Sequence, residues 1–173
     1  MVFTKLFPRT GYSAEAHRLY SEIVSQARLP ALYRAYGVPD TLDGRFELIV
    51  LHAFLLLDRL KHEETVRPLT QDLFDVMFAD LDQSLREMGV GDLSVGKKIK
   101  VMARSFYGHM AAYEEAIADG TLADALARNL YGTVPVDRDV VEKMQDYVVR
   151  QRQSLESADL EDFRAGHIPF VKV

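Results

Sequence analysis

Residues 91–98, which read GDLSVGKK, fall one residue short of a nucleotide-binding P-loop. In that motif a glycine is followed by four residues, then by Gly, Lys and a Ser or Thr whose hydroxyl binds Mg²⁺. Gly91, Gly96 and Lys97 fit the pattern, but Lys98 stands where the hydroxyl is needed. The residues before Gly91 have helical spacing, whereas a P-loop follows a buried strand. We therefore interpret the stretch as a turn between two helices.

Four basic residues lie close together in and after this turn: Lys97, Lys98, Lys100 and Arg104. Spacings of three and four place Lys97, Lys100 and Arg104 on one face of a helix. We expect Lys97 and Lys98 in its first turn, where the helix dipole disfavours positive charge. Two interpretations of this basic strip stay open. It is either a solvated face paired with nearby carboxylates, or a contact for an anionic partner such as RNA, lipid headgroups or an acidic protein surface.

A second dense group of charges lies in PDTLDGRFE, residues 39–47, which contains Asp40, Asp43, Arg45 and Glu47. Asp and Thr side chains favour turns and helix caps, so the local interpretation is a loop that caps the next helix. The functional interpretation is a rigid, charged recognition loop. The sequence does not choose between the two.

No other group of residues indicates catalysis or metal binding. The sequence has no Cys, no G-x-S-x-G, no HExxH and no Glu-x-x-His pair. His52 lies in the most apolar stretch of the chain, and we interpret it as a hydrogen-bonded core histidine. We predict no catalytic residue, no metal site and no cofactor.

The composition is that of one soluble domain of 173 residues, with 48% apolar and 27% charged residues and a net charge of −5. The negative charge argues against a DNA-binding protein. The longest apolar stretch, Leu48–Leu57, is too short to span a bilayer. The first residues contain no apolar segment of the length that a signal peptide needs. We expect a cytoplasmic protein, with peripheral contact to the inner face of the membrane left open.

Apolar residues recur with helical spacing along nearly the whole chain. They predict helices at about residues 14–29, 45–61, 65–88, 94–119, 121–131 and 137–156, with short turns at 31–37 and 158–166. Gly89, Gly120 and Gly132 are expected helix stops, and Asp92 or Ser94 is the expected cap of the fourth helix. The expected fold is all-α, a single compact domain over residues 1–173 with six or seven helices and irregular ends at about 1–12 and 166–173.

Two features refine this picture. The helix at 45–61 is apolar almost all round and should lie at the centre of the bundle. Five methionines fit the apolar stripes of their helices and are expected in the core: Met77, Met88, Met102, Met110 and Met144. Methionine is also the residue that suits an adaptable binding surface.

Three stretches, read together, resemble the ubiquinol–cytochrome c chaperone family. They are IVSQARLPALYRAYGVPDTLDGRFELIVLH (23–52), LTQDLFDVMFADLDQSLREMGVGDLSVGKKIKVMARSFYG (69–108) and GHIPF (166–170). The resemblance covers about residues 20–131. It implies a non-enzymatic assembly chaperone for ubiquinol–cytochrome c reductase that binds newly made cytochrome b. It also implies a small partner protein and the ribosome as further partners. The alternative from another class is a helical bundle that binds haem or quinone, or an enzyme with an interior site.

Overall fold

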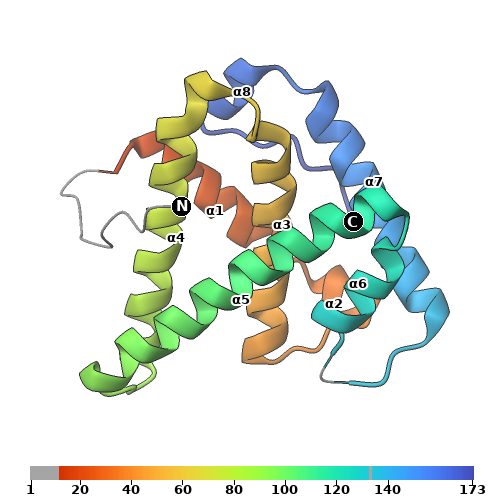
Figure 1. Cartoon of the computed structure of the whole chain (residues 1–173), viewed down its shortest axis with the longest axis horizontal. Coiled ribbons are helices and arrows are strands. Elements are labelled where there is room, and N and C mark those ends of the chain that lie inside the picture. The colour runs from red at the N-terminus through yellow and green to blue at the C-terminus, as the bar shows by residue number, and fades with distance from the viewer. Residues whose placement is uncertain (1–11, 133) are drawn as a thin grey trace.

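A computed structural model describes residues 12–132 and 134–173, and all regular structure in these residues is helical (Figure 1). The elements are α1 (Ala14–Ala27), α2 (Pro30–Arg34), α3 (Leu42–Leu60), the 3₁₀ turn η1 (Glu64–Val66), α4 (Arg67–Glu87), α5 (Asp92–Asp119), α6 (Leu122–Asn129), α7 (Arg138–Ser157) and α8 (Leu160–Arg164). The prediction of an all-α bundle is confirmed. The end predicted to be irregular at 1–12 lies, apart from Tyr12, outside the described residues.

Helix α3 is the centre of the bundle, as its composition predicts. It packs against α1, α5 and α7, and α5 crosses in front of it in Figure 1. Its side chains are buried on nearly every side, among them Leu48, Leu51, Phe54 and Leu56. A helix that is apolar all round has no face to turn to water, so its neighbours must enclose it.

Two helices begin earlier than predicted, because other residues cap them. Thr41 caps α3, since its hydroxyl oxygen accepts the backbone N–H of Gly44 at 3.1 Å. Gly91, in an extended conformation, occupies the cap position of α5, so neither Asp92 nor Ser94 is its cap. The first turn of α5 is therefore residues 92–95, and the expectation that Lys97 and Lys98 lie in a first turn is wrong.

The predicted helix stops at Gly89 and Gly120 are confirmed. Gly120 follows α5 with a φ of 71°, and Gly89 follows the end of α4 with a φ of 82°. Residues without a Cβ adopt this left-handed conformation at little cost. The turn at Gly89 places the end of α4 beside the start of α5, at one extreme of the molecule (Figure 1).

Residues 167–173 form no helix or strand but pack along α1 and α7. The backbone N–H of Val171 donates to the side chain of Gln151 at 3.0 Å, and its carbonyl accepts from Gln151 and Gln26 at 2.9 and 3.1 Å. Ile168 is buried, and the ring of Phe170 meets the ring of His52 edge-on at 5.4 Å. This C-terminal segment therefore joins the first helix to α7.

His52 is fully buried beneath that segment, and the prediction of a hydrogen-bonded core histidine is confirmed. Its Nδ1 donates to the carbonyl of Leu48 at 2.7 Å, since a carbonyl can only accept. Its Nε2 then accepts from the hydroxyl of Tyr147, also at 2.7 Å. Burial lowers the pKa of His52 to about 4, so the ring is neutral.

No helix among the described residues combines the length and the apolar character needed to cross a membrane.

Candidate functional site

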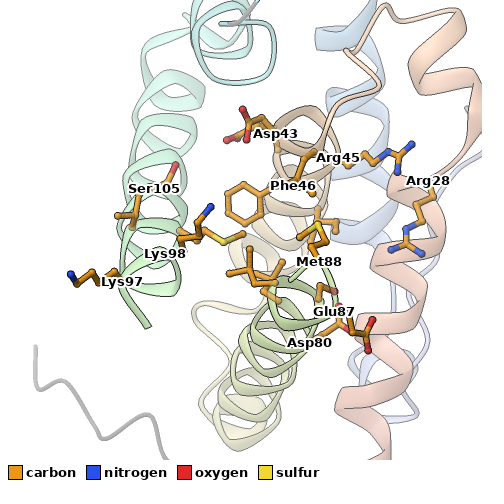
Figure 2. A pocket seen from close by; sticks show the side chains of 18 residues that line it. Arg28, Asp43, Arg45, Phe46, Asp80, Glu87, Met88, Lys97, Lys98 and Ser105 are labelled. Atoms are coloured by element: carbon orange, nitrogen blue, oxygen red, sulfur yellow. The ribbon is translucent and has the colours of Figure 1, made fainter. Parts of the chain in front are cut away.

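A groove of about 710 Å³ lies between the start of α3, the end of α4 and the first half of α5. Figure 2 shows Phe46 of α3 between α5 on one side and Met88 on the other. Arg28, just beyond α1, lies at the far edge. We call this hollow the α3–α5 groove.

The floor of the α3–α5 groove is apolar. We use the word floor for all apolar residues that line the groove: Leu42, Phe46, Ile49, Leu81, Leu85, Met88, Val101 and Met102. Three of these side chains are largely exposed to water: Leu42 at 61%, Val101 at 64% and Met88 at 52%. Exposed apolar side chains are ordinary when single, but a group of them around one hollow marks a binding surface.

Met88 corrects one prediction. Its spacing from Leu81 and Leu85 predicts a core position, but it is half exposed because α4 ends at Glu87 and Met88 lies beyond the last turn. Met77 and Met144 are buried as predicted, and Met102 and Met110 are partly buried. Periodicity alone could not separate Met88 from the others.

The fold brings together charges that lie about fifty residues apart in the sequence. Asp43, Arg45 and Glu47 of α3 line the same groove as Lys97 and Lys98 of α5. In Figure 2 Lys98 points toward Phe46, whereas Lys97 points away from α3. The group predicted as a recognition loop is mostly helical: only Asp40 precedes α3, because the helix begins at Leu42. Asp40 accepts from the guanidinium of Arg45 at 2.7 Å, and this pair lowers the pKa of Asp40.

The basic strip is divided between two surfaces. Lys97 and Lys98 lie at the groove, while Lys100 and Arg104 lie on α5 outside it. All four side chains are exposed, and none forms an ion pair with a residue in the described part of the chain. Nearby Arg86, in contrast, contacts both Asp82 and Asp92.

Sequence reasoning missed one pair at the groove. The carboxylate of Glu47 lies 2.7 Å from Nδ1 of His109, and the two side chains are only 14% and 20% exposed. Neither of these two atoms has another hydrogen-bond partner among residues 12–132 and 134–173. The pair joins α3 to α5 through Glu47, which also lines the groove. No local signal links positions so far apart in the chain.

Chemically, the α3–α5 groove offers apolar contact area and charge. Within the described ranges, no three His, Asp or Glu side chains converge as metal ligands would. Both signs of charge surround the apolar floor: Arg28, Arg45, Lys97 and Lys98 against Asp43, Glu47, Asp80 and Glu87. Such a surface suits an apolar segment of another protein with polar groups at its edges.

Comparison with known proteins gives one consistent result. The family model described as ubiquinol-cytochrome C chaperone matches residues 34–170. Ubiquinol-cytochrome c reductase complex assembly factor 1 of Mus musculus is 28% identical over 174 residues, which cover 92% of this chain and 59% of the mouse protein. Mitochondrial protein CBP3 of Saccharomyces cerevisiae is 30% identical over 146 residues, 80% of this chain and 44% of the yeast protein. The chain thus spans somewhat more than half the length of the mouse protein and less than half the length of the yeast protein.

Among solved structures, the crystal structure of the Cbp3 homolog from Brucella abortus is similar over almost the whole chain. The TM-score is 0.81 at 37% sequence identity, and the alignment covers 93% of this chain and 91% of that one. The residues of this chain that the family model matches, 34–170, contain α3, α4 and α5, which form the α3–α5 groove, whereas Arg28 at its far edge precedes them.

Proposed function

The chain belongs to the ubiquinol-cytochrome C chaperone family, and from that premise we propose that it is a non-enzymatic assembly factor for ubiquinol–cytochrome c reductase that binds newly made cytochrome b. The names of its relatives support the first half of this proposal, since they are assembly factors of that complex. The second half, that cytochrome b is the client, rests on the apolar lining of the α3–α5 groove.

The single observation that carries the proposal is the exposed apolar floor of the α3–α5 groove. Leu42, Met88 and Val101 are more than half exposed, whereas most large apolar side chains of the described residues are buried or partly buried. An unassembled membrane protein exposes apolar segments that must be covered until they find their place. An amphipathic or apolar helix laid into a groove is a common mode of peptide recognition.

The same observation favours the chaperone over a bundle with an interior haem or quinone site. Small-molecule sites enclose most of their ligand. The side chains that ring this groove face water, and charged groups of both signs surround it. Such an arrangement fits a protein segment that extends beyond the groove at both ends.

The test replaces one groove residue while leaving the net charge unchanged. Val101→Gln places a polar side chain on the floor, and Val149→Gln is the matched control, because Val149 is a 40% exposed residue of α7. We expect Val101→Gln to weaken client binding by about tenfold and to lower the amount of assembled reductase and its b-type haem absorbance. Val149→Gln should leave both at the wild-type level.

A photo-crosslinking residue at Leu42 identifies the client directly. The expected product is a covalent adduct with cytochrome b. Products with ribosomal proteins or a small partner protein would instead assign the part of the groove around Leu42 to those partners. If deletion of the whole gene leaves the reductase at its normal level, the proposed function is wrong. If deletion removes the reductase but Val101→Gln does not, the function stands and the client binds elsewhere.

A further inference from the structure

One side of α5 carries exposed positive charges that form no ion pair with another described residue. Between Asp92 and Glu114 the sequence contains no acidic residue, although the whole chain has 26 of them. Two carboxylates near the start of α5 already have partners: Asp92 contacts Arg86, and Glu87 accepts from the side-chain amide of Gln83. In a chain with a net charge of −5, the stretch between Asp92 and Glu114 is a local region of positive potential, because it carries Lys97, Lys98, Lys100 and Arg104.

Three of these basic residues form a continuous row on α5 together with one apolar and one aromatic residue. Leu93, Lys97, Lys100, Arg104 and Tyr107 follow one another at spacings of four, three, four and three, so they lie along one side of α5. We call this row the α5 ridge. Its three cations cover about 10 Å along the helix axis. Apart from Lys97, no member of the ridge lines the α3–α5 groove.

The two ends of the α5 ridge are apolar or amphipathic and exposed. Leu93 is 93% exposed, more than any other large apolar side chain of the described residues, and Tyr107 is 56% exposed. The turn between α4 and α5, just before Leu93, lies at an extreme of the molecule (Figure 1). Leu93 thus has no packing role within the fold.

We propose that the α5 ridge binds the surface of a membrane that contains anionic lipids. Lys97, Lys100 and Arg104 contact lipid phosphates, and Leu93 enters the apolar boundary below the headgroups. This combination of cations with a protruding apolar residue is how peripheral helices bind such surfaces. The inference deepens the proposed function, on which it rests for its purpose: it would hold the protein where an apolar client must be delivered.

Lipid fits the α5 ridge better than RNA does. Proteins that bind single-stranded nucleic acid stack successive bases on several aromatic side chains. The ridge has one aromatic residue, Tyr107, which already stacks against Phe74 with a ring separation of 5.5 Å. A leucine exposed to this degree contributes nothing to phosphate binding, whereas it contributes directly to insertion among lipids.

The test measures the partition of the purified protein, without any client, onto vesicles. Vesicles of phosphatidylcholine mixed with phosphatidylglycerol are compared with phosphatidylcholine alone, at low and at high salt. We expect binding to the mixed vesicles only, and its release at high salt. Lys100→Gln with Arg104→Gln should lower the partition coefficient about thirtyfold, because each cation near an anionic surface contributes roughly fivefold.

The matched control is Arg34→Gln with Arg128→Gln. It removes the same charge from exposed residues of α2 and α6, neither of which forms an ion pair within the described ranges. The control should bind mixed vesicles as the wild type does. Leu93→Gln should weaken binding about tenfold with no loss of folding stability.

Three results would overturn the inference. They are absence of binding to the mixed vesicles, equal binding to phosphatidylcholine alone, and equal weakening by the ridge and control pairs. Binding of an RNA oligonucleotide that the ridge pair abolishes, without vesicle binding, would assign the ridge to nucleic acid. The proposed function is tested separately, because Val101→Gln should bind vesicles normally while it loses the client, and the ridge pair should still bind the client in detergent.

Discussion

At the scale of single residues, the protonation state of His52 affects the stability of the fold. Its two ring nitrogens are both satisfied, one by the carbonyl of Leu48 and one by the hydroxyl of Tyr147. A proton added to Nε2 would face the Tyr147 hydroxyl, which would then have to stop donating. The position is buried on every side, so water cannot compensate.

This arrangement predicts how stability depends on pH. The pKa of His52 falls from 6.5 in the unfolded chain to about 4 in the folded one, so below pH 6.5 the unfolded state binds the proton more readily. The stabilisation is complete above pH 6.5 and is lost as the pH falls toward 4. Between about pH 7.5 and pH 5 the free energy of unfolding should drop by about 2 kcal/mol from this residue alone.

Denaturant unfolding at the two pH values measures that drop in the wild type and in His52→Gln. The variant should be less stable at the higher pH, but its loss between the two pH values should be smaller by about 2 kcal/mol. An identical pH-dependent loss in both proteins would show that other groups account for it.

Residue chemistry could be predicted from the sequence only where a local pattern decided it. A histidine inside LIVLHAFLLL has to be buried and hydrogen-bonded, and it is. The contact between Glu47 and His109 could not be predicted, because it depends on where α5 crosses α3. Met88 has the spacing of a core residue and is exposed only because the helix stops just before it.

At the scale of elements, the start of α3 depends on a glycine. A Cβ built on Gly44 would lie 2.1 Å from the carbonyl oxygen of Pro39, in the loop that enters the helix. Thr41 must stay close to this point to cap the helix, so the loop cannot move away freely. The start of α3 also carries Asp43, Arg45 and Glu47 to the groove.

Gly44→Ala should therefore destabilise the protein by about 2 kcal/mol or more. The matched control is Gly96→Ala in α5, where a Cβ would meet nothing within 4 Å. That change should stabilise the protein by about 0.5–1 kcal/mol, because alanine is the better helix former. The two melting temperatures should move in opposite directions, and a shift in the same direction would contradict the argument.

The helices themselves could be predicted, and so could the first residue of α1, but the first residues of α3 and α5 could not. Periodicity of apolar side chains finds the body of each helix, while the start depends on which of several possible oxygens caps it. Asp40, Thr41 and Asp43 are all suitable, and only the structure selects Thr41. For α5 the selected position is Gly91, which has no capping side chain. This shift of two residues moved the lysines out of the first turn.

At the scale of the whole molecule, the C-terminal segment holds the outer helices together. Gln151 and Gln26 both bind the carbonyl of Val171, and Ser154 donates to the carbonyl of Pro169 at 2.7 Å. A sequence without regular periodicity gives no sign of such packing. The groove was equally beyond prediction, since α3, α4 and α5 contribute to it from distant positions.

Removal of residues 168–173 should lower the free energy of unfolding by about 4 kcal/mol. The deletion exposes the site of Ile168, which is 2% exposed, and leaves the amide of Gln151 without its partner. Lys172→Ala, in the same segment but exposed, should change the free energy by less than about 0.5 kcal/mol. Unfolding by denaturant compares the three proteins, and equal stability of the deleted and complete chains would contradict the prediction.

The long reach of that segment also determines when the protein can finish folding during its own synthesis. Val171 and Gln26 stand 145 positions apart, and every residue of the α3–α5 groove is translated between them. Contacts of such separation form late, since the intervening chain must first be ordered. The growing chain thus exposes its own apolar groove before its first and last segments can join. During that interval it exposes apolar surface to water, as its proposed client does before assembly.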